Sequence, residues 1–179
     1  MATITLILGG ARSGKSSHAQ HLAEETGKSV TFLATAQALD DEMSARIQKH
    51  RGERPAHWTT LEVPIDITTH IQQIQSNIVI LDCVTLLVSN LLMQFVQNDL
   101  VDEAPFMSSV QKEMNELLAA LKNTDQHWII ISNEVGLGLV PEYQMGRAYR
   151  DGLGWANQTL ARAADQAIFM VAGIPMVVK

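Results

Sequence analysis

A glycine-rich segment near the N-terminus restricts the fold of this chain more than any other feature. The segment reads GGARSGKS over residues 9–16 and fits the pattern G-x-x-x-x-G-K-[S/T]. It follows a short apolar run, TITLIL at residues 3–8, and it precedes a helix-forming stretch over residues 15–25. Phosphate-binding loops typically lie between a strand and a helix, as this segment does. A glycine-rich turn that binds no ligand would have the same sequence pattern.

In a phosphate-binding loop, each residue type has a chemical task. Glycines let backbone N–H groups turn inward around phosphate oxygens, and the following helix adds the positive end of its dipole. Lys15 would reach the β- and γ-phosphates of a nucleoside triphosphate, and Ser16 would bind Mg²⁺ through its hydroxyl. The segment therefore predicts a nucleotide site at the end of the first strand.

The rest of the chain alternates between predicted strands and predicted helices. Further strands are expected at 29–34, 77–82, 127–132, 166–173 and 175–179, and helices at roughly 40–50, 66–75, 84–96, 105–122 and 142–165. Residues 58–63 fit either a short strand or an extended arm. Gly152 and Gly154 weaken the middle of the last helix, and the acidic segment 97–105 is expected to be an exposed loop. This order predicts an α/β P-loop NTPase, with a mostly parallel sheet and helices on both faces. The length of 179 residues suits a single nucleotide-binding domain over 1–179.

Composition excludes several classes of protein. A net charge of -6 argues against a general nucleic-acid binder, because such binding depends on a basic surface. The single cysteine, Cys83, allows no internal disulfide and fits a reducing compartment. No apolar run approaches the ~20 residues that span a bilayer, and the N-terminal run lacks the basic start and cleavage site of a signal peptide. We therefore expect a soluble, cytoplasmic protein without a membrane span.

Asp82 ends the apolar run NIVILD at residues 77–82. In P-loop proteins, an acid at the end of such a strand holds Mg²⁺ directly or through water. The same residue would also serve as an ordinary cap for the helix that is expected to begin at Val84. Both interpretations stay open from the residues alone.

His50 lies among basic residues, in the segment RIQKHRGERP at 46–55. On a helix, Arg46 and His50 share one face because they are four residues apart. One interpretation is a solvated basic helix end that Gly52 terminates. The other is a phosphate-binding cluster in which arginines bind a polyphosphate and the imidazole attacks phosphorus.

Beyond the loop, the sequence resembles a known enzyme family. The resemblance runs nearly end to end and rests on two specific blocks, E-M-x-x-R-I-x-x-H-R-x-x-R-P-x-x-W at 42–58 and NEVGLGLVP at 133–141, besides GGARSGKS and ILDCVTLLVSNLL. The chain looks like a bifunctional adenosylcobinamide kinase / adenosylcobinamide-phosphate guanylyltransferase of cobalamin assembly. The loop alone is common to many NTPases, whereas the two longer blocks are far more specific.

The resemblance implies a two-step activity. Members phosphorylate the aminopropanol hydroxyl of adenosylcobinamide with ATP or GTP, then take GMP from GTP onto a histidine and pass it to the new phosphate. It also implies a RecA-like core, Mg²⁺, and a homotrimer. The histidine maps to His50, so His50 and Lys15 are the expected catalytic residues, with Ser16 and Asp82 as Mg²⁺ ligands. The implied nucleotide contacts are Gly9, Gly10, Ala11, Arg12, Ser13, Gly14, Lys15, Ser16, Ala34, Thr35, Ala36, Arg51, Gly52, Glu53, Arg54, Glu62 and Asp82.

Two other functions remain compatible with the loop. One is a P-loop kinase for a small metabolite that forms no covalent intermediate. The other is a regulatory ATPase of RecA type, which would act on no corrinoid. The general base of the kinase step is not identified by the sequence, since Glu62 and Asp82 both qualify.

Overall fold

A computed structural model describes residues 1–38, 40–52 and 54–179, except for the side chains at positions 42 and 46. Along the chain its elements are β1 (Thr3–Gly9), α1 (Lys15–Glu25), β2 (Val30–Ala34), α2 (Asp41–Gly52), β3 (Thr59–Glu62), the 3-10 helix η1 (Ile67–Gln73), β4 (Ile78–Asp82), α3 (Val84–Met93), β5 (Val96–Gln97), β6 (Leu100–Val101), α4 (Glu103–Leu121), β7 (His127–Asn133), α5 (Gln144–Ala163), β8 (Gln166–Val171) and β9 (Ile174–Val177). None of the helices in these ranges is long and apolar enough to cross a membrane.

Seven strands form the main sheet, in the order β3-β2-β4-β7-β1-β8-β9. The first six are parallel, and β9 returns antiparallel to β8. β1 lies between β7 and β8, with its register running from Thr3 opposite His127 to Gly9 opposite Asn133. This arrangement confirms the predicted mostly parallel α/β sheet.

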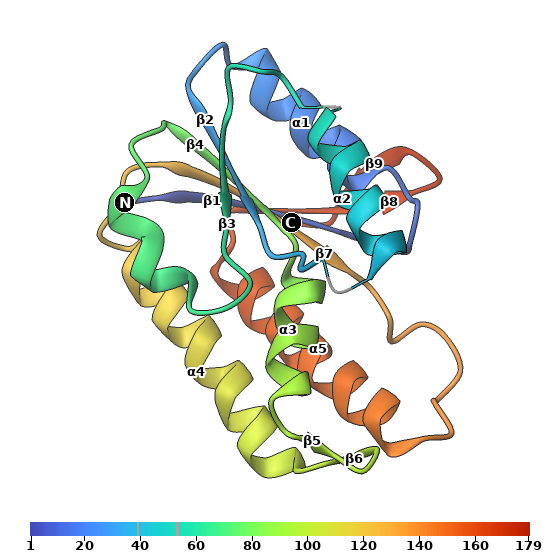
Figure 1. Cartoon of the computed structure of the whole chain (residues 1–179). Coiled ribbons are helices and arrows are strands. Elements are labelled where there is room, and N and C mark those ends of the chain that lie inside the picture. Colours follow the sequence, from blue (N-terminus) through green and yellow to red (C-terminus); the bar gives the residue numbers. More distant parts are fainter. Residues whose placement is uncertain (39, 53) are drawn as a thin grey trace.

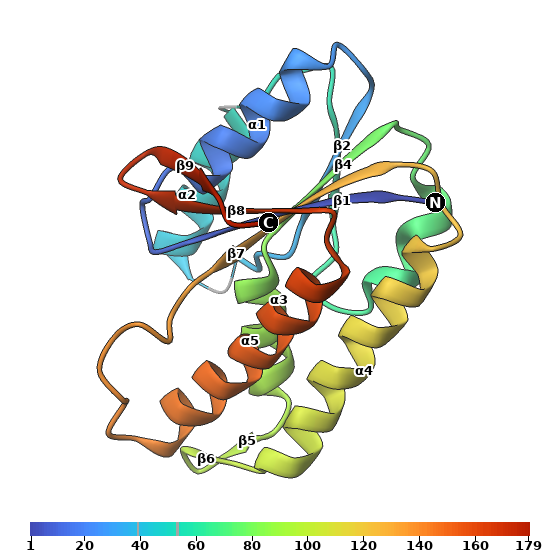
Figure 2. The ribbon, with the colours of Figure 1, turned by 180° about the vertical axis from the view of Figure 1, so that it is seen from behind.

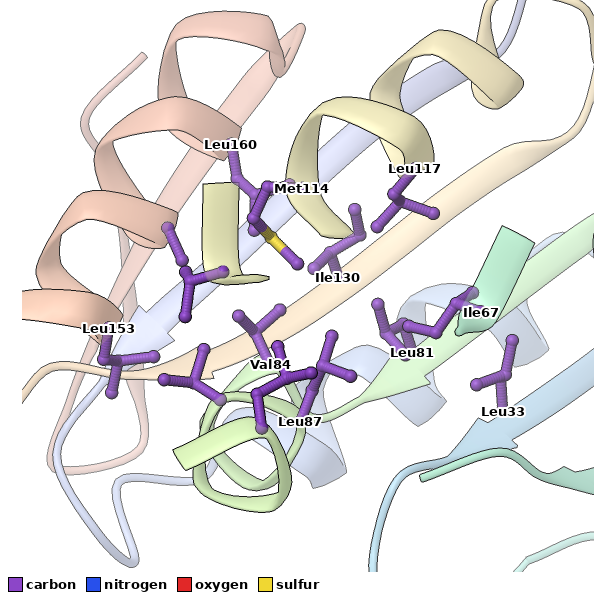
Figure 3. Close-up of a cluster of buried hydrophobic side chains, with 14 of the residues drawn as sticks. Leu33, Ile67, Leu81, Val84, Leu87, Met114, Leu117, Ile130, Leu153 and Leu160 are labelled. Carbon is purple, nitrogen blue, oxygen red and sulfur yellow. The ribbon is translucent and has the colours of Figure 1, made fainter. Parts of the chain in front are cut away.

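Helices cover both faces of this sheet (Figures 1 and 2). α1 packs on one face, α2 lies on the same side of the sheet, and α3, α4 and α5 pack on the other face. The central strands are apolar on both sides because each face is buried against helices. The larger core cluster lies between the sheet and α3, α4 and α5 (Figure 3), where side chains such as Leu81, Ile130, Met114 and Leu160 meet.

Gly152 allows α5 to approach α4 closely. A Cβ atom at this position would lie 2.7 Å from Cζ of Phe106, a fully buried side chain of α4. At Gly154, a Cβ atom would have nothing within 4 Å. The helix nevertheless runs unbroken from Gln144 to Ala163, so the first glycine serves packing rather than a break.

Two local predictions are confirmed only in part: segment 97–105 is exposed except at Val101 but is not a plain loop, and the helix predicted at 66–75 is of the 3-10 type. The predicted exposed loop at 97–105 contains a short hairpin, β5–β6, and the start of α4. Gln144 holds this hairpin, since its Oε1 accepts the N–H of Val101 at 3.0 Å. The predicted helix at 66–75 is the 3-10 helix η1, whose first N–H, that of Ile67, donates to the buried Glu113 carboxylate at 2.9 Å.

Candidate nucleotide-binding site

The predicted site residues gather at one edge of the sheet. In parallel strands, the carboxyl ends point the same way and form the edge where α/β sheets bind ligands. β1, β2, β3, β4 and β7 end there at Gly9, Ala34, Glu62, Asp82 and Asn133. Strand pairing places Ala34 opposite Asp82 and Gly9 opposite Asn133.

The loop from Gly9 to Lys15 has the backbone shape of an anion cradle. Arg12 and Gly14 both have positive φ, 57° and 93°. A Cβ atom at Gly9 would lie 2.6 Å from the carbonyl oxygen of Met170, so only glycine fits there. α1 then begins at Lys15, and within the described chain no side chain caps it and no acidic residue stands in its first turn. Its first N–H groups therefore face the loop with the positive end of the helix dipole.

Lys15 is buried and turned back over this loop. Its Nζ donates to the carbonyl oxygen of Gly10 at 2.6 Å and to Oγ of Ser13 at 3.4 Å. Burial lowers the pKa of Lys15, whereas Cys83 and Asp82 act to raise it. The ammonium group is thus held at the loop, where phosphate oxygens would bind.

Ser16 and Asp82 form a pair of oxygen ligands. Ser16 Oγ donates to Oδ2 of Asp82 at 3.0 Å. Burial raises the pKa of Asp82, and the Ser16 hydrogen bond, His50, Arg54 and Lys15 lower it in that order. Mg²⁺ prefers such hard oxygens and binds through one or two of them together with substrate phosphates. Among the described residues, no group of three His, Cys, Asp or Glu side chains could hold a metal alone, so this pair with a nucleotide fits Mg²⁺ best.

The alternative role of Asp82 as a helix cap is absent from the described chain. The residue that precedes α3 is Cys83, and it makes no capping hydrogen bond through its side chain. The Asp82 carboxylate points instead to Ser16.

A cavity of about 760 Å³ opens beside this pair. His50 lines it from α2, together with predicted residues from the other segments. The predicted residues that line the cavity are Ser16, Ala34, Ala36, His50, Arg51, Arg54, Glu62 and Asp82. One cavity therefore holds the proposed metal ligands and the proposed nucleophile.

Arg51 and Arg54 have different surroundings within the cavity wall. Arg51 Nη2 lies 3.6 Å from Oε1 of Glu62, and both side chains are more than half exposed, so this ion pair contributes little to stability. Arg54 lies with its guanidinium carbon 3.6 Å from the ring centroid of Phe32. Burial lowers the pKa of Arg54, and Asp82 opposes that shift. The stacked guanidinium is therefore held in place inside the cavity.

Several predicted nucleotide contacts do not line this cavity. Thr35 is fully buried, and neither it, Gly52 nor the loop before Ser16 lines the cavity. Glu53 and the side chain of Arg46 fall outside the part of the chain that the structure describes.

The sequence did not reveal how Asn133 is held in the cavity wall. Its N–H donates to Oγ1 of Thr85 at 2.7 Å, and its carbonyl oxygen accepts from Nδ2 of Asn157 at 2.9 Å. Both partners come from helices distant in sequence, so no local pattern marks them.

Comparisons with known proteins show the family and the fold of this chain. The bifunctional adenosylcobalamin biosynthesis protein CobP of Pseudomonas aeruginosa is 42% identical over 97% of this chain and 96% of its own length. The corresponding CobU protein of Escherichia coli is 40% identical over 97% and 98%. Among solved structures, the RadB recombinase superimposes with a TM-score of 0.52 at 13% identity, over 93% of this chain and 73% of that one, which confirms the RecA-like fold. The model of one family, cobinamide kinase / cobinamide phosphate guanyltransferase, matches residues 5–178, and the chain therefore belongs to that family, as its resemblance predicted.

Proposed function

We propose that this kinase and guanylyltransferase works through a covalent GMP adduct on His50. In the first step it phosphorylates the aminopropanol hydroxyl of adenosylcobinamide with ATP or GTP. In the second it transfers GMP from GTP, through His50, to the new phosphate and yields adenosylcobinamide-GDP. The observation that carries the proposal is that His50 lines the same cavity as Ser16 and Asp82.

In the kinase step, the chain positions the triphosphate and neutralises its charge. The N–H groups of the loop and of the start of α1 would bind phosphate oxygens, and Lys15 would bind the β- and γ-phosphates. When bound by Ser16 and Asp82, Mg²⁺ would offset the charge of the β- and γ-phosphate oxygens. The substrate hydroxyl forms a bond to the γ-phosphorus while the bond from that phosphorus to the β-phosphate oxygen breaks. Glu62 and Asp82 are the carboxylates on the described cavity wall that qualify to take the hydroxyl proton.

In the transfer step, a neutral His50 would attack the α-phosphorus of GTP. The bond from the α-phosphorus to the bridging oxygen breaks, and pyrophosphate leaves. Arg51 and Arg54 on the same wall would stabilise the charge on the leaving group. A phosphate oxygen of adenosylcobinamide phosphate then attacks the α-phosphorus and displaces the imidazole, which restores His50.

Labelling the protein with GTP carrying α-³²P tests this intermediate. With Mg²⁺, the protein should acquire a label that acid removes and base leaves intact, as a phosphorus–nitrogen bond requires. His50→Asn should abolish the label, and His57→Asn, an exposed histidine outside this cavity, should keep it. A label that survives in His50→Asn would show that another residue is the nucleophile. A protein with kinase activity and no label would instead be a simple P-loop kinase.

We also propose that residues 1–179 form one nucleotide-binding domain and that the protein works as a homotrimer in the cytoplasm. The continuous seven-stranded sheet supports the single domain, the family resemblance supports the homotrimer, and the single cysteine fits the reducing environment of the cytoplasm. Light scattering after size-exclusion chromatography should give three times the mass of one chain.

A further inference from the structure

Thr35, directly after β2, binds the peptide group that follows the proposed metal ligand. The residue is fully buried, with 0% exposure. Its hydroxyl accepts the N–H of Cys83 at 2.9 Å and donates to the carbonyl oxygen of Cys83 at 2.7 Å. Its own N–H donates to the carbonyl oxygen of Asp82 at 3.1 Å. Thr35 therefore holds the chain on both sides of the bond that joins Asp82 to Cys83.

These bonds begin where the sheet stops. The pairing of β2 with β4 ends at Ala34 opposite Asp82. β4 ends at this point and α3 begins at Val84, so the hydrogen bonds of the sheet no longer hold the backbone here. The Thr35 side chain supplies the missing restraint one residue beyond the ladder.

Asn90 on α3 holds Thr35 in turn. Its Nδ2 donates to the carbonyl oxygen of Thr35 at 2.8 Å and to that of Pro64 at 3.0 Å. Pro64 follows β3 and lines the cavity near Glu62, the partner of Arg51. One amide thus joins the ends of β2 and β3 to the helix that follows Asp82.

We propose that Thr35 and Asn90 are positioning residues that set the direction of the Asp82 carboxylate toward Ser16. The inference rests on the proposed role of Asp82 and Ser16 as Mg²⁺ ligands. Groups behind a metal ligand fix its orientation, and their loss reduces metal affinity about 10–100-fold. Neither residue lines the cavity beside Ser16 and Asp82, so each acts through the backbone around Asp82.

Two substitutions at Thr35 separate the effect of its hydroxyl from the effect of its side-chain volume. Thr35→Val keeps the volume of the side chain and removes the hydroxyl, whereas Thr35→Ser keeps the hydroxyl. The measurement is the affinity for Mn²⁺ in the presence of a non-hydrolysable GTP analogue. Free Mn²⁺ is detected by its electron paramagnetic resonance signal. Thr35→Val should bind Mn²⁺ about 10–100-fold more weakly, and Thr35→Ser should bind close to the unmodified protein.

Two controls make the result interpretable. Asp82→Asn removes the carboxylate charge itself, so Mn²⁺ binding unchanged in this variant would overturn the metal site rather than the positioning role. Gly152→Ala destabilises a contact with Phe106, and neither residue lines the cavity, so the Mn²⁺ affinity of this variant should stay unchanged; the variant thereby separates positioning from general loss of stability.

The positioning role is overturned if Asp82→Asn weakens Mn²⁺ binding while Thr35→Val does not. Should Thr35→Val fail to fold, Asn90→Ala provides the same test, because it removes both hydrogen bonds to Thr35 and Pro64 at a partly exposed position. Weaker Mn²⁺ binding in Asn90→Ala supports the inference, and unchanged binding refutes it.

Discussion

Two glycines two residues apart on α5 should respond in opposite directions to the same substitution. In a helix interior, Gly→Ala stabilises by about 1 kcal/mol because alanine loses less conformational freedom on folding. Gly154→Ala should show this gain in full, since its Cβ atom meets nothing within 4 Å.

Gly152→Ala should destabilise instead. Its Cβ atom would lie 2.7 Å and 2.8 Å from two ring carbons of Phe106, whose ring is fully buried and cannot turn away. Overpacking of this kind costs ~1–3 kcal/mol, and two contacts below 3 Å on a rigid ring place it near the upper end. After the alanine gain is subtracted, a net loss of about 2 kcal/mol remains. The melting temperature should fall by about 4–8 °C in a chain of this size.

Urea unfolding followed by circular dichroism measures both effects. The midpoint should move to lower urea for Gly152→Ala and to higher urea for Gly154→Ala, with an unchanged slope. In the double variant Gly152→Ala/Phe106→Leu, the two effects should be strongly non-additive, because the smaller side chain relieves the contact. If both glycine variants gain stability equally, the close approach of α5 to α4 is refuted.

Two further predictions concern charged groups. Lys15→Ala should weaken GTP binding at least about tenfold, because a hydrogen bond to a charged group contributes ~1.5–3 kcal/mol; unchanged affinity by calorimetry would contradict the P-loop assignment. Burial lowers the pKa of His127 below its ordinary value of 6.5, and Lys28 lowers it further while Asp165 raises it. The unfolded chain therefore binds more protons just below pH 6.5, so this contribution to stability is complete above that pH and is lost as the pH falls. The urea midpoint should fall less between about pH 7.5 and about pH 5 in His127→Gln than in the unmodified protein. An unaltered pH dependence would contradict the lowered pKa of His127.

The sequence predicts the parts of the site that follow directly from local order. Asp82 ends one apolar run, and Lys15 and Ser16 end the glycine-rich loop that follows another; parallel strands bring the ends of such runs to one edge of the sheet. The placement of His50 in the cavity wall agrees with the family resemblance. The order of the strands in the sheet does not follow from any of these patterns.

Features that depend on distant segments could not be predicted. Thr35 and Asn90 act together only because β2, β3 and α3 meet in space. The 3-10 helix η1 depends on Glu113, whose carboxylate arrives from α4, 46 residues later in the chain.

The β5–β6 hairpin could have been predicted, because the sequence of its turn favours a hairpin. Asn98 and Asp99 both have positive φ, as the two central residues of a tight hairpin turn require, and these residue types favour it.

The place of β1 in the middle of the sheet has a consequence for how the enzyme is made. The phosphate loop emerges early from a ribosome, yet the neighbours of its strand are residues 127–133 and 166–170. Until those segments exist, β1 has two open edges and the loop lacks Gly173, whose N–H donates to the carbonyl oxygen of Ser13 at 3.0 Å. The nucleotide site is therefore complete only after residues 166–173 have been translated.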